Sequence, residues 1–205
     1  RTLGRPGYGI QSITLDRTVG PATLSFGMSR LREEDTVLGG RFSSTFSGRG
    51  ATSHFLDGTA SFDLGQGWGA NASYRRGWTS LPGSGAMVTR GWLDTEAFAA
   101  DVSKVGAFAR GDRLAFRVTQ PLRVAQGGFD LDLPVRYDYS TGAVGHEERF
   151  FNLAPNGREM VYEAAYSVGW LGGDLGLNAY LRTDPGHVEA MPTDIGGAIR
   201  FALGF

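Results

Sequence analysis

The chain has 205 residues, with 20 basic and 21 acidic side chains and a formal net charge of −1 at pH 7. This length suits one sizeable domain, and the balanced charge gives no basis for binding nucleic acid through its phosphates. Cysteine is absent, which excludes disulfides, thiolate metal sites and cysteine nucleophiles. Glycine is the outlier at 32 residues, about twice its usual share. No apolar run approaches the roughly 18 residues of a transmembrane helix.

Apolar residues alternate with small or polar ones along most of the chain, and this pattern predicts strands rather than helices. Two glycine-rich polar segments, 30–54 and 77–95, are predicted to be long loops. Pro134 counts against a central strand at 129–137, because proline cannot donate in a ladder. In chain order, the predicted strands cover about 11–17, 22–29, 56–64, 68–75, 98–103, 113–119, 129–137, 143–153, 161–170, 175–182 and 194–205.

A chain of many strands without helices predicts a β-sandwich or a β-barrel. Three features favour a membrane barrel: opposed apolar and polar faces, aromatic residues at strand ends, and connections that alternate between short and long. The predicted lumen-facing polar residues are Arg117, Asp130, Asp132, Arg136, Glu163 and Arg200. The predicted lipid-facing residues are Phe129, Leu131, Leu133, Val135, Leu175 and Leu177. The predicted interface aromatics are Trp68, Tyr137 and Trp170.

The loop lengths also set the expected strand number. The strand at 143–153 alternates poorly and is included because it places both long loops on the same side. Single-chain bacterial barrels have even strand numbers, and every strand in lipid needs two neighbours. We therefore expect residues 1–205 to form one outer-membrane domain, an all-β antiparallel up-and-down barrel with about eleven strands from this chain. A twelfth is expected upstream of Arg1 or from another chain.

Residues with catalytic or metal-binding chemistry do not form a recognisable motif. His54, His146 and His187 lack ligand spacing, and no nucleophile elbow or phosphate-binding loop is present. The sequence therefore predicts no enzyme activity, no metal and no cofactor. Arg110, Gly111 and Asp112 spell an adhesion tripeptide, but they fall on a predicted periplasmic turn, where chance is the better interpretation.

The carboxyl end carries the first resemblance to known proteins. Ile199, Phe201, Leu203 and Phe205 alternate up to the last residue, and this ending resembles the assembly signal of bacterial outer-membrane proteins. Three further segments, at 111–124, 152–159 and 182–187, read GDRLAFRVTQPLRV, NLAPNGRE and RTDPGH. Together they resemble the β-domain of autotransporters, particularly those with a subtilisin-like protease as passenger.

The resemblance implies a non-enzymatic translocator and anchor of type V secretion, located in the bacterial outer membrane. An amino-terminal passenger would reach the cell surface through its pore. The implied partners are outer-membrane lipid and lipopolysaccharide, the barrel-assembly machinery, and an upstream passenger or a neighbouring chain that supplies a strand. Such domains usually carry a helix in the lumen, and this sequence shows no such helix.

Two other interpretations stay open at this point. The chain could be a small structural barrel subunit of a larger surface complex, with its missing strand supplied by a neighbour. It could also be a soluble all-β binding domain, because alternation alone does not separate lipid-facing from core-facing residues.

Overall fold

The computed structural model describes residues 7–34, 36–41, 50–83 and 87–203. The described residues form one ten-stranded antiparallel sheet, a two-stranded hairpin, and one short 3-10 turn, η1 (Pro185–His187). The strands are β1 (Tyr8–Val19), β2 (Ala22–Glu33), β3 (Thr36–Val37), β4 (Gly40–Arg41), β5 (Ala51–Gly65), β6 (Trp68–Pro82), β7 (Val88–Val105), β8 (Arg113–Tyr137), β9 (Val144–Asn152), β10 (Met160–Trp170), β11 (Gly173–Thr183) and β12 (Asp194–Leu203). The predicted all-β antiparallel fold is confirmed.

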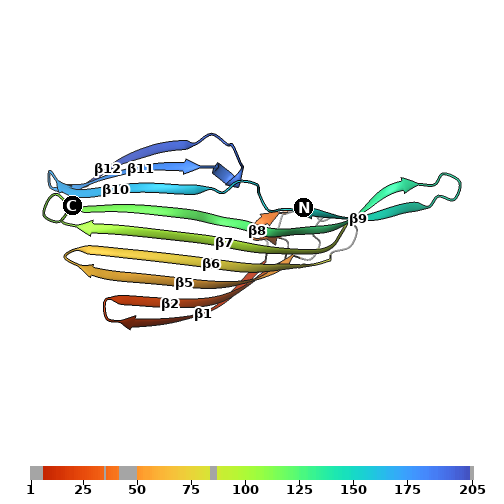
Figure 1. Cartoon of the computed structure of the whole chain (residues 1–205), viewed down its shortest axis with the longest axis horizontal. Helices are drawn as coiled ribbons and strands as arrows, with labels where there is room; N and C mark the ends of the chain where they lie inside the picture. The colour runs from red at the N-terminus through yellow and green to blue at the C-terminus, as the bar shows by residue number, and fades with distance from the viewer. Residues whose placement is uncertain (1–6, 35, 42–49, 84–86, 204–205) are drawn as a thin grey trace.

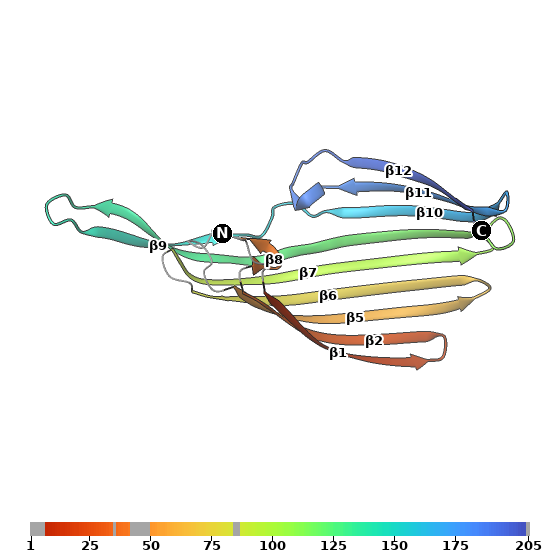
Figure 2. The same cartoon turned by 180° about the vertical axis from the view of Figure 1, so that it is seen from behind.

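Neighbouring strands in the sheet follow the order β1-β2-β5-β6-β7-β8-β10-β11-β12, and β9 pairs with β8 outside this path. Both cartoon views place β1 and β12 at opposite edges of the sheet (Figure 1, Figure 2). No pairing joins these two edges among the described residues. Closure of the sheet into a barrel is therefore not part of what the structure shows.

The connections divide into a short-turn end and a long-loop end. At the short-turn end, β5 and β6 are joined by two residues, and so are β10 and β11. Gln66 and Gly67 have φ values of 51° and 81°, and Leu171 and Gly172 have 49° and 76°. Two consecutive positive φ values are the mark of a type I′ turn, which matches the twist of the strands it joins. These short turns agree with the prediction.

Much of the described part of the two predicted long loops is strand. Residues 77–82 continue β6 and residues 88–95 begin β7, while 30–33 end β2 and 51–54 begin β5. These strand ends are rich in glycine and polar residues and lack a consistently apolar face. Their sequence therefore has no clear period-two pattern, and they could not be recognised as strands. The sheet strands are therefore longer than predicted, with 15 residues in β5 and β6 and 18 in β7.

The strands predicted at 113–119 and 129–137 are a single strand, β8, of 25 residues. The strand predicted at 143–153 exists as β9, but it pairs with the far half of β8 and does not lie between β8 and β10. The prediction of eleven consecutive sheet strands is therefore wrong. Nine positions lie across the sheet, and β1 and β12 both run toward the short-turn end.

Strand β8 carries two extra residues relative to β7. The pairing Glu96↔Arg123 is followed by Phe98↔Gln120, and Asp94↔Gln126 is followed by Thr95↔Val124. Each extra residue of a β-bulge reverses which face the following side chains occupy. Because there are two, the second restores the original alternation, and even-numbered residues face the same side in both halves of β8.

Pro134 fits this strand for a geometric reason. The Leu153 N–H donates to the Gly127 carbonyl at 2.9 Å, and the Asp132 N–H donates to the Met87 carbonyl at 2.8 Å. Backbone groups of successive residues point to opposite sides of a strand, so position 134 directs its nitrogen away from β9. β7 pairs with β8 only as far as Leu131. The missing N–H of Pro134 therefore interrupts no ladder.

Three aromatic side chains lie across glycines of the neighbouring strand. Phe55 is opposite Gly77, Phe129 is opposite Gly91, and Tyr180 is opposite Gly196. A Cβ atom added at Gly77 would lie 2.5 Å from Phe55 Cδ1 and 2.5 Å from Thr95 Oγ1. The glycines leave the space that the aromatic rings fill.

We predict that Gly77→Ala lowers the free energy of unfolding by about 1–3 kcal/mol, because it overpacks the Phe55 contact. Gly58→Ala is the matched control in the adjacent strand, since nothing lies within 4 Å of its added Cβ. The control is expected to be neutral or to stabilise by up to about 1 kcal/mol. Equal losses in the two variants, measured by denaturant unfolding, would contradict the packing role of Gly77.

Candidate functional site

The cross-strand register gives the sheet two chemically distinct faces. Residues paired across strands share a face, so one face can be followed from β1 to β12. We call it the tryptophan face, because all four tryptophans of the chain, Trp68, Trp78, Trp92 and Trp170, lie on it. The opposite side, which carries Arg75 and Arg117, is called the arginine face.

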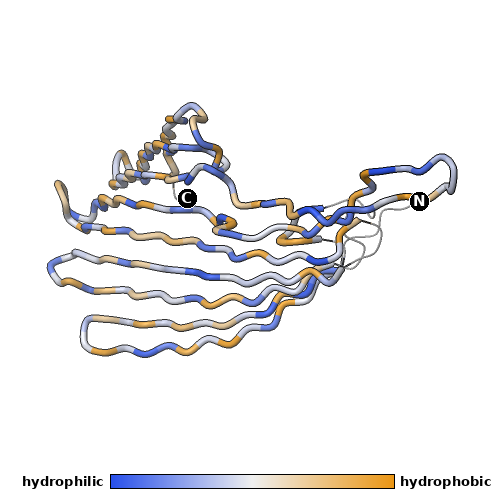
Figure 3. The backbone as a smooth tube through the Cα atoms, turned by 45° about the vertical axis from the view of Figure 1, so that its right-hand side comes forward, coloured by the Kyte–Doolittle hydropathy of each residue, from blue (hydrophilic) through white to orange (hydrophobic). Residues whose placement is uncertain are grey.

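Exposed apolar side chains lie on the tryptophan face of β1, β2, β5, β6, β8, β10, β11 and β12, with Arg17 as a charged member of this face on β1. Figure 3 shows the underlying alternation of hydrophobic and hydrophilic residues along the strands. In β12, for example, Ile199 is 78% exposed and Phe201 is 45% exposed. Members of this face include Ile13, Leu15, Leu24, Phe26, Met28, Phe62, Tyr74, Phe116, Tyr162, Leu177, Leu181, Ile195, Ile199 and Phe201.

Two levels of tryptophan bound this apolar band. Trp68 and Trp170 lie at the short-turn end, and the Lys104 ammonium sits 5.6 Å from the Trp68 ring centre. Trp78 and Trp92 lie ten or more residues further along, and both are about two-fifths exposed. The apolar band thus has aromatic residues at both of its margins.

Ion pairs form a belt on the same face, from the row of Arg76, two residues before Trp78 on β6, to Arg90 beyond it. Arg76 Nη2 is 3.2 Å from Asp94 Oδ2, and Arg90 Nη2 is 2.9 Å from Asp130 Oδ2. Glu96 is bound by Arg158 at 2.9 Å. The tryptophan face therefore changes from apolar to charged within one or two residues of Trp78.

The arginine face is polar between the same levels. Arg117 lies between Asp101 on β7 and Glu163 on β10 in one cross-strand row, and Arg200 is opposite Gly176. Ser61, Asn71 and Asp101 form a hydrogen-bonded chain, and Arg75 pairs with Asp57. This face has the mixture of small residues and both charges that a hydrated surface requires.

The predicted lumen-facing residues divide into two groups. Arg117, Glu163 and Arg200 lie on the arginine face. Asp130 lies on the tryptophan face in its ion pair with Arg90, and Asp132 and Arg136 lie on the projecting hairpin of β8 and β9. Asp130 therefore does not share a face with Arg117, Glu163 and Arg200, although the prediction grouped the four together.

The predicted lipid-facing residues divide in the same way. Leu175 and Leu177 lie on the tryptophan face. Phe129 and Leu131 are only 2% and 7% exposed and belong to a buried cluster, so the prediction that they face lipid is wrong. Leu133 packs against that cluster, and Val135 is exposed on the projecting hairpin.

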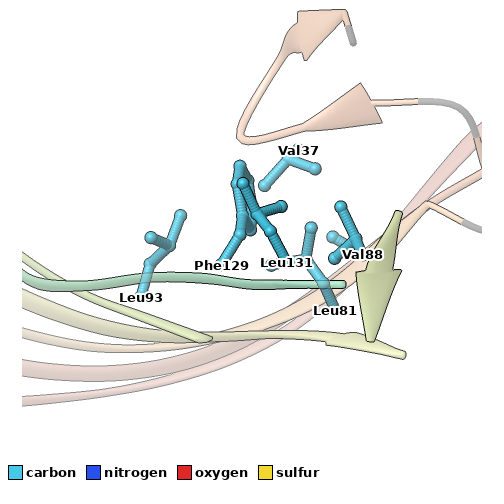
Figure 4. Packing of buried hydrophobic residues seen from close by; sticks show 7 residues of the cluster. Val37, Leu81, Val88, Leu93, Phe129 and Leu131 are labelled. Atoms are coloured by element: carbon cyan, nitrogen blue, oxygen red, sulfur yellow. The ribbon is translucent and has the colours of Figure 1, made fainter. Parts of the chain in front are cut away.

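The β3–β4 hairpin covers this buried cluster at the long-loop end of the arginine face. Figure 4 shows Val37 of β3 lying above Phe129 and Leu131 of the sheet. The cluster consists of Val37, Ala51, Leu81, Val88, Leu93, Phe129 and Leu131. The alternating apolar residues at 129–133 therefore belong to a small interior core or pack against it.

The Glu33 carboxylate holds the hairpin in place. It accepts hydrogen bonds from the Thr36 hydroxyl at 2.7 Å and from the Leu38 and Gly39 N–H groups at 2.8 Å each. Glu33 is 7% exposed, so these bonds replace the water that burial removes. Its role could not be seen in the sequence, because the segment has no regular period.

The three segments used for the resemblance come together at one junction. The Glu159 N–H donates to His187 Nδ1 at 3.0 Å, so the other ring nitrogen carries the proton and donates to the Leu122 carbonyl at 3.2 Å. Arg123 donates to the carbonyls of Pro155 and Gly157. With both ring nitrogens occupied, His187 joins β8, the end of the loop that leads into β10, and the loop before β12.

Asp112 organises the turn between β7 and β8. Its carboxylate accepts the N–H groups of Ala107, Phe108 and Ala109 and the Tyr166 hydroxyl, at 2.7–2.9 Å. Burial acts to raise the pKa of Asp112, but these hydrogen bonds outweigh it and lower the pKa below its ordinary value of 3.8. The aspartate of the Arg110–Asp112 tripeptide therefore has a structural role in this turn.

The remaining predicted positions lie as follows. Trp68 and Trp170 bound the apolar band, whereas Tyr137 lies far from it, near the tip of the projecting hairpin. Ile199, Phe201 and Leu203 lie on the tryptophan face of β12, and Phe205 lies outside the described residues. Within the described ranges, no group of three or more histidine and acidic side chains is arranged to hold a metal ion.

No helix among the described residues is long and apolar enough to cross a membrane. Protein-family models, curated proteins and solved structures gave no match to the chain.

We predict that Asp112→Asn destabilises the fold at pH 7 and that the difference from the wild type shrinks in acid. A carboxylate with a lowered folded-state pKa contributes stability above its unfolded pKa, and this contribution is lost as the pH falls through the folded value. Unfolding measured at pH 7 and at about pH 3 tests this. Tyr166→Phe removes one of the four donors and should show a smaller effect. A pH-independent difference would contradict the account.

Proposed function

We propose that the chain forms the wall of a bacterial outer-membrane β-barrel that acts as the anchor and translocator domain of an autotransporter. The observation that carries the membrane part is the continuous exposed apolar tryptophan face, bounded by tryptophans on both sides. A soluble protein rarely exposes a contiguous apolar surface of this extent, and lipid is the solvent that suits it.

The height of the band supports this proposal. Trp68 and Trp78 are ten residues apart on β6, which corresponds to about 34 Å along an extended strand. Barrel strands in membranes tilt by roughly 35–45°, so the band would be about 26 Å tall across the bilayer. This agrees with the apolar band of roughly 25 Å found in outer-membrane barrels. The charged belt around Trp78 would then lie at the headgroup level.

The long-loop end would face the cell exterior, and the arginine face would line a polar lumen. Passage of a polypeptide fits a lumen lined by Arg117, Glu163 and Arg200. The β3–β4 hairpin lies over the long-loop end of that face, so a translocating segment would have to displace it or pass beside it. The motifs that resemble autotransporter β-domains lie in β8, in the loop between β9 and β10, at the end of β11 and in η1, and in β12.

The closing strand would determine how the domain works. Because β1 and β12 run in the same direction, an antiparallel barrel requires an odd number of additional strands between them. An upstream segment that leads into a passenger would supply them in a translocator. The barrel-assembly machinery and outer-membrane lipid, including lipopolysaccharide, are the partners that this proposal implies.

A second candidate is a structural barrel subunit of a larger surface assembly. The observation that favours it is the exposure of all of β1, whose outer edge has no neighbouring strand among the described residues. A neighbouring chain would then supply the closing strand. In this case, crosslinks from the outer edge of β1 would join two different chains, whereas in a translocator they would lie within one.

We predict that Leu177→Arg impairs folding into bilayers and costs about 2–4 kcal/mol, because it places a charge near the middle of the apolar band. Asn178→Arg, its neighbour on the arginine face, should cost about 0.5 kcal/mol or less. Folding into lipid vesicles, followed by the heat-dependent shift in gel mobility, measures both. If Asn178→Arg were the more damaging change, the assignment of the faces to lipid and water would be reversed.

A further inference from the structure

The hairpin formed by β9 and the far half of β8 projects beyond the rest of the sheet (Figure 1, Figure 2). β7 accompanies β8 only as far as Leu131 and Asp132. β9 pairs with β8 alone, and no other described strand lies beside its second edge. This nine-residue edge therefore has unpaired backbone groups.

The tip of the hairpin is well ordered by its own contacts. The Asp138 carboxylate accepts the N–H and hydroxyl of Ser140 at 2.9 and 2.7 Å, and the Asp138 N–H donates to the Ala143 carbonyl at 2.8 Å. The rings of Tyr137 and Tyr139 pack edge to face at 4.9 Å. A preorganised hairpin loses little conformational entropy when it binds a partner.

The hydrogen bonds between β8 and β9 show which backbone groups of β9 point toward its free edge. The Leu153 N–H donates to Gly127, so every second residue of β9 pairs inward with β8. The N–H groups of His146, Glu148 and Phe150 therefore point away from β8. The side chains of these three residues share one face of the hairpin.

That face places two acidic side chains opposite each other, which is unfavourable as long as no partner neutralises them. Asp132 and Glu148 are directly opposite each other in a pair that is not hydrogen-bonded, where side chains come closest. Like charges at such positions are destabilising. His146 Nδ1 contacts Asp132 Oδ2 at 2.9 Å, whereas Glu148 has no ion pair among the described residues. Next to it, Phe150 is 53% exposed.

We propose that the free edge of β9 is a docking site for an extended peptide segment that adds to the hairpin as a further strand. The segment carries a basic residue opposite Glu148 and an apolar residue opposite Phe150. Strand addition satisfies the outward N–H and carbonyl groups, and the basic side chain relieves the Asp132–Glu148 repulsion.

The charges of β9 make a second copy of this chain a poorer partner. Antiparallel self-pairing centred on Glu148 would place two Glu148 side chains opposite each other. Charged residues in the middle of an exposed edge are a common means of preventing such self-association. The same carboxylates favour a basic partner.

The experiment uses the full chain in detergent micelles and a fluorescein-labelled ten-residue peptide. One face of the peptide carries a central lysine with valine two residues away on each side, and threonine fills the alternate positions. Fluorescence anisotropy gives the Kd. We expect Glu148→Lys to weaken binding at least tenfold, with Phe150→Ser as a second variant in case the first does not fold. Asp174→Lys makes the same charge change at the short-turn end and should leave the Kd within twofold.

A second peptide, N-methylated on the residues that bond to the edge, separates strand addition from simple charge attraction. It should bind at least tenfold more weakly than the unmodified peptide. Equal binding of the two peptides, a less than twofold effect of both Glu148→Lys and Phe150→Ser, or association of the chain with itself through β9 would overturn the proposal.

Discussion

Cross-strand register is the constraint on which the rest of this structure depends. Side chains alternate strictly between the two faces of a strand, so a slip of one residue would exchange every apolar and polar position. Across nine positions of the sheet the register keeps the tryptophans on one face and Arg75, Arg117 and Arg200 on the other. The two extra residues in β8 preserve this arrangement because each cancels the effect of the other.

The chemistry of the two faces of the sheet differs between its two levels. Between Trp68 and Arg76 the tryptophan face is mainly apolar and the arginine face is polar, which is the arrangement that the proposed barrel wall requires. Beyond Trp78 the roles reverse: the tryptophan face carries ion pairs, and the arginine face carries the buried cluster under β3–β4. The change occurs along continuous strands. The proposed membrane boundary is therefore a change in side-chain chemistry without a break in the backbone.

This reversal explains what could be predicted from the sequence. Alternation identified the all-β fold, the short turns at Gln66–Gly67 and Leu171–Gly172, and the apolar face of β11 and β12. The same argument failed at Phe129 and Leu131, because period two is identical for a lipid-facing strand and a strand that covers a small core. It also failed at 30–54 and 77–95, where glycines and polar residues interrupt the apolar positions, so that the strands continue without a clear period-two signal.

The side chains that hold the loops could not be found by pattern at all. Glu33, Asp112 and His187 act through hydrogen bonds to backbone groups, some close in the sequence and others more than sixty residues away. Their partners become neighbours only when the register is known. In the sequence, His187 was considered as a possible metal ligand and Asp112 as part of an adhesion tripeptide. In the structure, both side chains instead hold loops in place through hydrogen bonds.

The proposed assignment of the two faces to lipid and water can be measured directly on β11. The chain has no cysteine, so single cysteines introduced at successive positions from 175 to 181 can carry a spin label in lipid bilayers. The account predicts that collisions with oxygen dominate at the odd-numbered positions and collisions with a water-soluble nickel chelate at the even-numbered ones. Equal accessibility of all positions to the chelate, or the opposite alternation, would contradict it.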